Sequence, residues 1–322
     1  MKLFITGAGG QLGHALSRKM SEQPRHQVIA SAAQQSLPET EVAASPATPR
    51  NGAATSTSSR TASQVMRVHE VHALTHAQLD IAQLSAVRAA IEHVEPDLVI
   101  NAAAYNHVDG AESDPVAAYR GNALGPRNLA LVTAAHGIPL LHVSTDYVFA
   151  GTAKRPYHEF DRTNPQSVYG ESKLAGEEAV KALNPRHYLV RTAWLYHITG
   201  KNFPRTMCAL ARQHKEVRVV NDQIGSPTYV PHLVDALVRL LPTKAYGTYH
   251  LAGQGEVSWY ELTCVLYKML HIDTVVRPVS TTAFPRPAKR PAYSALTTIQ
   301  EPLIVLPLWK IGIQQFAEQL TG

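Results

Sequence analysis

The sequence contains very little cysteine and has no long apolar runs. Its 322 residues include two cysteines, Cys208 and Cys264, which lie far apart without CxxC spacing, so neither a disulfide framework nor a cysteine zinc site is expected. No apolar run reaches the ~18 residues that cross a bilayer, and the apolar stretch at the N-terminus is too short for a signal peptide. We therefore expect a soluble protein of the reducing cytoplasm that makes no contact with a membrane.

Runs of basic residues are missing as well. The formal net charge is +5, but the lysines and arginines are scattered along the chain, so a nucleic-acid partner is not expected. A mild positive field of this kind suits a small anionic substrate that carries phosphates. Hydrophobic residues make up 45% of the chain and charged residues 17%, which is the balance of a folded globular protein.

Short apolar runs alternate with segments of helical periodicity in the first half of the chain. The apolar runs lie at residues 3–6, 98–100 and 140–144, and the periodic segments at residues 11–20, 84–94 and 125–136. Strands that alternate with helices predict an α/β fold with a Rossmann-type, doubly wound parallel sheet.

This alternation is interrupted once and loosens toward the C-terminus. Residues 31–65 are rich in Ala, Ser, Thr, Gln and Pro and contain no aromatic residue, which predicts a disordered, low-complexity insertion. The second strand then lies either at residues 28–30 or at residues 68–74. After about residue 191 prolines become frequent, so we expect a Rossmann domain in residues 1–190. Residues 191–322 would form mainly a smaller α/β lobe, with some segments returning to the first domain.

Three glycines follow the first strand and open the first helix. Gly7, Gly10 and Gly13 have the GxxGxxG spacing. Glycine permits a tight turn and lets backbone N–H groups and the helix N-terminus approach a pyrophosphate. A purely structural turn is the alternative, but the position after the first strand favours dinucleotide binding. We assign Gln11 and Leu12, which complete the turn, to the same cofactor site.

Two further segments are candidates for the cofactor site. Asp80 and Ile81 follow the second expected strand, where a carboxylate can contact the adenine end of a cofactor or cap the next helix. Ala103 and Ala104 close the third expected strand. Their small side chains would let the backbone approach the cofactor, or they would serve tight core packing.

A tyrosine and a lysine with Tyr-x-x-x-Lys spacing form the candidate catalytic pair. Tyr169 and Lys173 lie four residues apart on an expected helix and so share one face. Thr145 lies at the end of an expected strand, the end at which such sheets bind ligands. An ammonium and a nicotinium charge near a phenol favour the phenolate, so we expect Lys173, together with the cofactor, to lower the Tyr169 pKa. An ordinary surface pair is the alternative.

Longer motifs resemble the dTDP-4-dehydrorhamnose reductase family, within the short-chain dehydrogenase/reductase superfamily. The resemblance covers most of the chain outside residues 31–65. The matching segments are Asn101-Ala-Ala-Ala-Tyr105, Val108-Asp-Gly-Ala-Glu112, Ser144-Thr-Asp-Tyr-Val-Phe149, Val168-Tyr-Gly-Glu-Ser-Lys-Leu-Ala-Gly-Glu177, Arg191-Thr-Ala-Trp194, Asn221-Asp-Gln-Ile-Gly-Ser-Pro-Thr228 and Arg290-Pro-Ala-Tyr-Ser-Ala-Leu296.

The resemblance implies reduction of the C4 ketone of dTDP-4-dehydro-6-deoxy-L-mannose to dTDP-L-rhamnose with NADPH or NADH. Tyr169 would donate the proton, Thr145 would bind the same oxygen, and Lys173 would also hold the nicotinamide ribose. Residues 1–190 would bind the cofactor and residues 191–322 mainly the substrate. The resemblance adds Tyr105 to the cofactor site, and it adds Val108, Asp146 and Trp194 to a substrate site that also includes Thr145 and Tyr169.

Some assignments stay open on the sequence alone. Trp194 would pack against the sugar or serve as a core residue, because aromatic rings commonly supply packing area. Residues 221–228 suit a turn at a dimer or lobe interface at least as well as substrate contact, and residues 290–296 suit a structural loop as well as a diphosphate contact. The insertion occupies the region that usually discriminates NADPH from NADH.

We expect no metal site. Some members of the family bind Mg²⁺ at a dimer interface, but Ala15 and Pro231 stand at two of the matching positions and only Glu318 remains acidic. His72 and His76 have His-x-x-x-His spacing in a segment that reads as strand and turn, without the convergent geometry of a zinc site. The resemblance allows a homodimer.

Two other functions compete with this hypothesis. One is a reductase or epimerase that acts on a different nucleotide sugar, because fold and catalytic residues are shared by many substrates. The other is a non-catalytic regulatory subunit of the kind that binds methionine adenosyltransferase. The presence of Thr145, Tyr169 and Lys173 together favours an enzyme.

Overall fold

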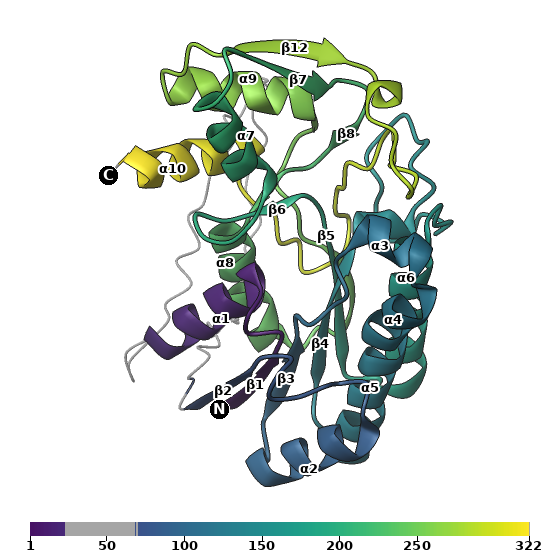
Figure 1. The fold of residues 1–322 in the computed structure, drawn as a ribbon. Coiled ribbons are helices and arrows are strands. Elements are labelled where there is room, and N and C mark those ends of the chain that lie inside the picture. The colour runs from purple at the N-terminus through teal and green to yellow at the C-terminus, as the bar shows by residue number, and fades with distance from the viewer. Residues whose placement is uncertain (23–67, 69, 322) are drawn as a thin grey trace, which may run out of the picture.

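The computed structural model describes residues 1–22, 68 and 70–321 (Figure 1). Its centre is a parallel sheet of six strands in the order β2-β1-β3-β4-β5-β10. The predicted insertion at residues 31–65 lies outside the described residues. The sheet strands are β1 (Lys2–Thr6), β2 (Glu70–Leu74), β3 (Leu98–Asn101), β4 (Leu140–Thr145), β5 (His187–Thr192) and β10 (Gly247–His250).

The predicted α/β fold with a parallel sheet is confirmed. The predicted strands at residues 3–6, 98–100 and 140–144 form β1, β3 and β4, each with slightly wider bounds. Of the two candidates for the second strand, the later one forms β2, which pairs in parallel with β1 from Lys2↔Glu70 to Thr6↔Leu74. The earlier candidate, at residues 28–30, lies outside the described residues.

The strand order reverses beside β1. The chain places β2 on one side of β1 and β3 on the other, so the connections leave in opposite directions. In open α/β sheets this switch point opens a crevice at the carboxyl ends of the strands, where ligands bind. The glycine turn at residues 7–13 lies at that end of β1.

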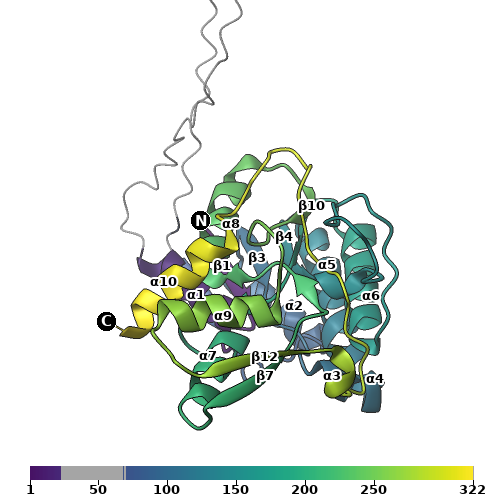
Figure 2. The same ribbon diagram turned by 90° about the horizontal axis from the view of Figure 1, so that it is seen from above.

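Helices cover both faces of the sheet (Figures 1 and 2). On β1, Leu3 and Ile5 point to one face and Phe4 to the other, as the alternation of a strand requires. α1 (Gln11–Glu22) and α8 (Val230–Leu240) cover the first face, and α2 (Leu84–Val94), α5 (Gly125–Ala135) and α6 (Val168–Leu183) cover the second.

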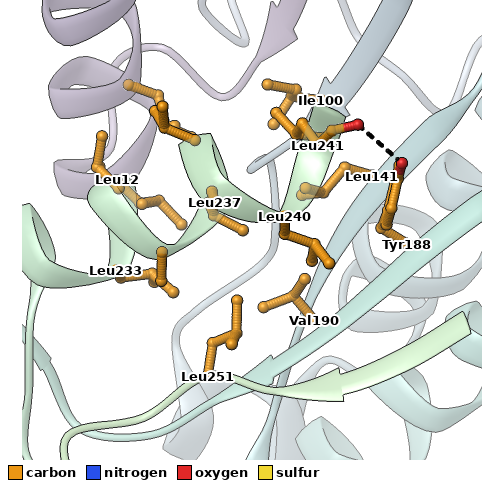
Figure 3. Close-up of a cluster of buried hydrophobic side chains, with 14 of the residues drawn as sticks. Leu12, Ile100, Leu141, Tyr188, Val190, Leu233, Leu237, Leu240, Leu241 and Leu251 are labelled. Carbon is orange, nitrogen blue, oxygen red and sulfur yellow. Dashed lines mark hydrogen bonds between the residues drawn. The ribbon is translucent and has the colours of Figure 1, made fainter. Parts of the chain in front are cut away.

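The core between α8 and the sheet is shown in Figure 3. Leu233, Leu237 and Leu240 of α8 are fully buried against strand residues such as Leu141. Burying a leucine side chain contributes roughly 1.5–3 kcal/mol, so this leucine-rich face holds α8 firmly on the sheet. The hydroxyl of the buried Tyr188 donates a hydrogen bond to the carbonyl of Leu241 at 3.0 Å.

Between β3 and β4 the chain forms a segmented run of helix. α3 (Val108–Ser113) and α4 (Pro115–Tyr119) lead into a π-helical turn, η1 (Arg120–Leu124), which continues directly into α5. A π-turn widens the helix by one residue and is common near functional sites. Sequence periodicity placed the start of this helix at residue 125 and so missed α4 and the π-turn.

The C-terminal part forms a second layer above the carboxyl ends of the sheet strands, at the top of Figure 1. Its core lies between three helices and a pair of parallel strands. Its elements are β6 (Leu195–Tyr196), α7 (Phe203–Ala211), β7 (Glu216–Val220), β8 (Ile224–Gly225), β9 (Thr228–Tyr229), β11 (Val257–Ser258), α9 (Trp259–Met269), β12 (Val275–Val279) and α10 (Trp309–Thr321). We call this layer the lobe. Although α8 and β10 follow residue 191, they pack with the sheet.

Candidate active site

The glycine turn packs so closely that Gly7 and Gly13 are sterically required. Gly7 has a φ of +75°, and a Cβ there would lie 2.5 Å from the backbone nitrogen of Ala103. A Cβ on Gly13 would overlap the carbonyl oxygen of Gly7. The amide of Gly10 donates to that carbonyl at 3.0 Å and closes the turn. The turn therefore offers a backbone surface, free of side chains, at the N-terminus of α1, as a bound pyrophosphate needs.

Two adjoining cavities open beside this turn and share Gly10 and Ala104. One, of about 530 Å³, is lined by the predicted cofactor residues Gly7, Gly10, Asp80, Ile81, Ala103, Ala104 and Tyr105. The other, of about 470 Å³, is lined by Gly10, Gln11, Leu12, Gly13, Ala104, Val108, Thr145, Asp146, Tyr169, Lys173 and Trp194. We call them the adenosine-side cavity and the catalytic cavity. Between them they bring together every residue that the sequence proposed for the site.

Two residues of the turn also serve other contacts. Leu12 lines the catalytic cavity and also belongs to the core beneath α8. The Gln11 side chain donates to the carbonyl of Lys201 at 3.0 Å and accepts from Asn202 at 3.1 Å. Gln11 thereby ties the glycine turn to the loop that precedes α7 in the lobe.

Asp80 lies on the wall of the adenosine-side cavity. Its carboxylate accepts from the amide of Ala82 at 2.9 Å and from the guanidinium of Arg120 at 3.2 Å. Burial raises the pKa of Asp80, but these hydrogen bonds and the Arg120 charge outweigh burial and leave the pKa below its ordinary value. The helix-capping interpretation is wrong, because α2 begins later and its N-cap position is Gln83. Arg120 is a cation in this cavity that the sequence analysis missed.

A buried asparagine fixes the loop between the two cavities. Asn122 accepts from the amide of Tyr105 at 2.8 Å and donates to the Tyr105 carbonyl at 3.1 Å. It also donates to the hydroxyl of Ser172 on α6 at 3.0 Å. The π-turn that presents Asn122 therefore joins the loop after β3 to the catalytic helix. No local pattern in the sequence marks this residue.

The carboxyl ends of β1, β3 and β4 are joined by a second buried network. The Thr6 hydroxyl donates to Asn101 at 2.7 Å, and Asn101 Nδ2 lies 2.9 Å from Nδ1 of His142. Burial lowers the pKa of His142 well below its usual range, and the nearby Lys173 lowers it further, so this imidazole is neutral. The network therefore fixes the strand ends without placing a charge there.

The candidate catalytic residues converge in the catalytic cavity. Tyr169 and Lys173 lie on the buried face of α6, whose first turn is capped by the side chain of Ser167. The Lys173 ammonium donates to the carbonyl of Val143 on β4 at 2.7 Å. Thr145, at the end of β4, hydrogen-bonds the Tyr169 hydroxyl. The predicted Tyr-x-x-x-Lys helix therefore faces the predicted end of the strand.

Burial decides the ionisation of this pair. Burial raises the pKa of Tyr169 to about 12, although the Thr145 hydrogen bond opposes the rise. Burial also lowers the pKa of Lys173 to about 8, against the charge of Glu177. We expected Lys173 to lower the Tyr169 pKa, but burial dominates and the ammonium points to Val143. Tyr169 therefore carries its proton at neutral pH, as a proton donor must.

The Thr145 hydroxyl has a fixed direction. It donates to the carboxylate of Asp146 at 3.0 Å and accepts from the amide of Tyr147 at 3.2 Å. A hydroxyl has one hydrogen, and an ionised carboxylate only accepts, so this hydrogen points at Asp146. Burial raises the pKa of Asp146 to about 6, while hydrogen bonds from Ser294 and Thr145 lower it. With a pKa of about 6, Asp146 is mostly ionised at neutral pH and can accept the Thr145 hydrogen.

Trp194 adopts a strained backbone at the edge of the catalytic cavity. Its φ is +46°, in the left-handed region that bulky residues rarely adopt. Such outliers cluster at functional sites. Its indole stacks on that of Trp259, with ring centroids 3.4 Å apart and planes 4° from parallel. Trp259 lines the same cavity and was missed, since nothing in its local sequence relates it to Trp194.

The two segments left open on the sequence both reach the catalytic cavity, through Gln223 and through Arg290 and Ser294. Arg290 pairs with Asp109 at 2.9 Å. Arg286 lies 3.7 Å from the same carboxylate, so Asp109 balances two cations beside the cavity. Arg290 is therefore a further candidate residue that the predicted site did not include.

The residues present fit a nicotinamide dinucleotide. Ser144 Oγ and Thr192 Oγ1 are buried on the wall of the catalytic cavity and have no hydrogen-bond partner among the described residues. Buried polar groups are almost always paired, so these two hydroxyls are ready to meet a polar ligand. The glycine turn supplies the phosphate cradle. Among the described residues no cluster of three or more metal-ligating side chains occurs, and none of the described helices is long and apolar enough to cross a membrane.

The fold and the site together define the class of protein. A glycine turn at the switch point of a parallel sheet, beside a buried Tyr-x-x-x-Lys helix, is the arrangement of a short-chain dehydrogenase/reductase with a C-terminal lobe.

Comparison with known proteins identifies the family. A family model described as the RmlD substrate binding domain matches residues 48–321. A dTDP-4-dehydrorhamnose reductase of Mycobacterium tuberculosis is 46% identical over 306 residues, which are 93% of this chain and 86% of the relative. The chain belongs to the RmlD family of dTDP-4-dehydrorhamnose reductases.

Two further relatives bear on cofactor and substrate. The crystal structure of a dTDP-4-dehydrorhamnose reductase from Bacillus anthracis, solved in complex with NADP, matches with a TM-score of 0.81 and 33% identity over 99% of both chains. A probable dTDP-4,6-dihydroxy-2-methyloxan-3-one 4-ketoreductase of Streptomyces antibioticus is 38% identical over 299 residues, 92% of this chain and 86% of the relative.

Proposed function

We propose that the protein reduces the C4 ketone of dTDP-4-dehydro-6-deoxy-L-mannose to dTDP-L-rhamnose, with NADPH or NADH as the reductant. The observation that carries the proposal is the convergence of Thr145, Tyr169 and Lys173 in one buried cavity beside the glycine turn. The 46% identity to a dTDP-4-dehydrorhamnose reductase supports the choice of substrate.

The cofactor would lie along both cavities. Its pyrophosphate would rest on the turn from Gly7 to Gly13, and its adenosine would lie between Asp80, Ile81 and the alanines after β3. Lys173 would hold the nicotinamide ribose, because its ammonium is buried beside the cavity. When bound, the reduced nicotinamide supplies a hydride to the ketone carbon. The NADP of the Bacillus anthracis relative supports this use of the site.

Tyr169 would protonate the ketone oxygen as negative charge develops there. Its raised pKa keeps the phenol protonated at neutral pH, and a donor in place neutralises the alkoxide as it forms. Thr145 was expected to donate to the same oxygen. Its hydroxyl lies beside the Tyr169 phenol and donates to Asp146 in this structure, so it would turn from Asp146 to meet the ketone oxygen.

The substrate would occupy the part of the catalytic cavity nearest the lobe. Val108, Asp146 and Trp194 lie on its wall, and Arg290 adds a cation that suits a diphosphate. In this proposal residues 1–190 bind mainly the cofactor and residues 191–322 mainly the sugar nucleotide. A cytoplasmic location and pairing of two copies belong to the same proposal, and cell fractionation and analytical ultracentrifugation test them.

A spectrophotometric assay tests the reaction. Purified protein is mixed with NADPH or NADH and with dTDP-4-dehydro-6-deoxy-L-mannose generated in place by a 3,5-epimerase, and absorbance of the reduced cofactor is followed. We expect oxidation that yields dTDP-L-rhamnose and that nearly disappears in Tyr169→Phe. Cofactor binding without turnover would contradict the proposal.

A second ketoreductase function is favoured by the Streptomyces antibioticus relative, whose name gives a different dTDP-linked ketone. The same assay with a panel of dTDP-linked 4-keto sugars separates the two functions. Higher kcat/KM on another ketone would move the assignment to that substrate. Absence of turnover on the whole panel, together with co-purification of a partner enzyme in fixed ratio, would indicate the regulatory role instead.

A further inference from the structure

The Trp194 indole is clamped between two parts of the lobe. One face stacks on Trp259, the first residue of α9, with ring centroids 3.4 Å apart. A Cβ built on Gly225 would overlap the indole, with Cζ2 at 2.6 Å and Nε1 at 2.7 Å. The atom that such a Cβ would meet most closely is Cε2, which lies between those two atoms in the ring. The approach is therefore from above the ring and not from its edge.

Gly225 and Trp259 must cover opposite faces of the indole. Two rings whose planes differ by 4° and whose centroids are 3.4 Å apart overlap almost fully, so Trp259 leaves no room on its own side. Gly225 is in β8 and pairs with Val257 of β11, two residues before Trp259. A single β8–β11 ribbon thus carries both sides of the clamp, and Trp194 presents only an edge to the cavity.

This arrangement changes how Trp194 can meet a sugar. With both faces covered, the indole cannot stack on the substrate, and its reach into the cavity depends on where the lobe holds it. The backbone of Trp194, at a φ of +46°, is strained and persists only when the surroundings impose it. Trp259 supplies the larger surface of the clamp. The ring of Phe203 packs against Trp259, with the ring centroids 4.3 Å apart.

We infer that Trp259 is a positioning residue that holds the edge of Trp194 against the sugar of the nucleotide-sugar substrate. The inference rests on the proposed function for the nature of the substrate, and it assigns to the lobe a part in sugar recognition. Without the Trp259 stack the Trp194 indole could rotate, and the sugar would lose a contact surface that is already in place before it binds. Binding of the adenosine half of the cofactor would be unaffected, because neither Trp259 nor Gly225 lines the adenosine-side cavity.

The test compares Trp259→Leu, Trp259→Phe and Gly225→Ala with wild type. We expect Trp259→Leu to raise KM for the keto sugar about tenfold while KM for the cofactor and affinity for dTDP alone change less than twofold. Trp259→Phe, which keeps an aromatic face, restores most of the wild-type KM. Gly225→Ala, which pushes the indole from the other face, raises KM in the same direction.

A spectroscopic signal tests the stack without turnover. Stacked indoles give an exciton couplet in circular dichroism when their transition dipoles are rotated relative to each other about the stacking axis, and the chain has only three tryptophans. We expect a couplet in wild type that is lost in Trp259→Leu and in Trp194→Phe but kept in Trp309→Phe, whose indole lies outside the cavity.

These results separate the inference from the proposed function. Failure of wild type to reduce any dTDP-linked ketone would sink the proposed function, whereas the couplet would still report the clamp. Wild-type KM in Trp259→Leu, or a couplet that survives in both Trp259→Leu and Trp194→Phe, would overturn the positioning role. If Trp259→Leu does not fold, Gly225→Ala decides: an unchanged KM for the keto sugar overturns the role.

Discussion

Two buried polar clusters lie one turn apart on α6 and differ in how completely their groups are paired. The Glu177 cluster consists of Glu177, Arg191, Glu159 and His250. Arg191 donates to both oxygens of Glu177, at 2.9 and 2.7 Å, and Glu159 accepts from the amides of His250 and Ile299 at 2.8 and 3.1 Å. Every charge of this cluster has a partner.

The Lys173 cluster is less completely paired. It consists of Tyr169, Lys173, Thr145 and Asp146, with the hydroxyls of Ser144 and Thr192 beside them. Lys173 has no carboxylate of its own and donates to a carbonyl, and the two hydroxyls have no partner among the described residues. Burial shifts the pKa of Tyr169, Lys173 and Asp146 from their ordinary values.

The contrast between the two clusters distinguishes residues that stabilise the fold from residues that bind a ligand or react with it. A saturated buried network holds elements together, whereas unpaired groups and shifted pKa values mark places where a ligand completes the bonding. The Glu177 cluster joins α6, β5 and the segment around Thr298. The Lys173 cluster keeps unpaired hydroxyls in residues that line the catalytic cavity. Substitutions in the Glu177 cluster should therefore change stability, and substitutions in the Lys173 cluster should change activity.

The largest effect is expected in the Lys173 cluster. Tyr169→Phe removes the proton donor and should lower kcat by roughly 100- to 10,000-fold, the usual contribution of a general acid. The midpoint of denaturant unfolding should change little, because the ring and its T-shaped contact with Tyr147 remain. Steady-state kinetics and urea titration measure the two. Activity within a few fold of wild type would remove Tyr169 from the mechanism.

The second effect belongs to the Glu177 cluster. Glu177→Gln leaves the charge of Arg191 buried without a counter-ion, which should lower the free energy of unfolding by about 3–5 kcal/mol. Glu178→Gln, at an exposed neighbouring position of α6, is the matched control and should change it by less than about 0.5 kcal/mol. Equal stability of the two variants would show that the Glu177 cluster is not structural.

A smaller effect is expected at the loop between the cavities. Asn122→Ala leaves the amide and carbonyl of Tyr105 without their partner, at a cost of about 1–3 kcal/mol. Because Tyr105 lines the adenosine-side cavity, Kd for the cofactor should rise as well. Ser172→Ala removes one of the three bonds of Asn122 and should have the weaker effect. Cofactor titration that finds no change in Asn122→Ala would contradict this role.

The smallest effect is a pH dependence of stability from Asp146. Its pKa is raised to about 6 in the folded protein, above the ~3.9 of an unfolded aspartate, so the folded state binds the proton more tightly. The stability that protonation contributes is fully present below pH ~3.9 and is lost as the pH rises through about 6. Asp146→Asn removes this slope.

Urea unfolding of wild type and Asp146→Asn between pH 4 and pH 7 measures this effect. As the pH rises, the free energy of unfolding of wild type should fall relative to that of Asp146→Asn. This difference should level off above pH ~6. Asp273→Asn, at an exposed position, is the control. A difference that stays constant over the range would show that Asp146 does not titrate there.

The first half of the fold could be predicted because its signals are local. The helix predicted at residues 84–94 has the observed bounds of α2, and the glycine turn lies directly after β1. The second strand could not be chosen, because both candidates are short apolar runs and the pairing with β1 depends on contacts distant in sequence. The return of α8 and β10 to the sheet was expected only in general terms, since no pattern marks which segments return.

The candidate site was predictable where motifs carry it and not where packing does. Gly7, Tyr169 and Lys173 stand in spacings that chemistry requires. Asn122 and Trp259 have no such spacing, because their partners Tyr105 and Trp194 lie far away in sequence. The burial of Tyr169, which raises its pKa, was also missed, because the extent of burial depends on the packed structure.

The transfer of a labelled hydride tests the central claim most directly. The protein is incubated with NADPH deuterated at C4 of the nicotinamide, on each face in separate samples, and with dTDP-4-dehydro-6-deoxy-L-mannose, and the product is examined by NMR and mass spectrometry. We predict dTDP-L-rhamnose that carries one deuterium at C4 of the sugar from one of the two labelled cofactors, and no such product from Tyr169→Phe in the same time. A product without deuterium at C4 from either cofactor, or no reduced sugar at all, would contradict the account.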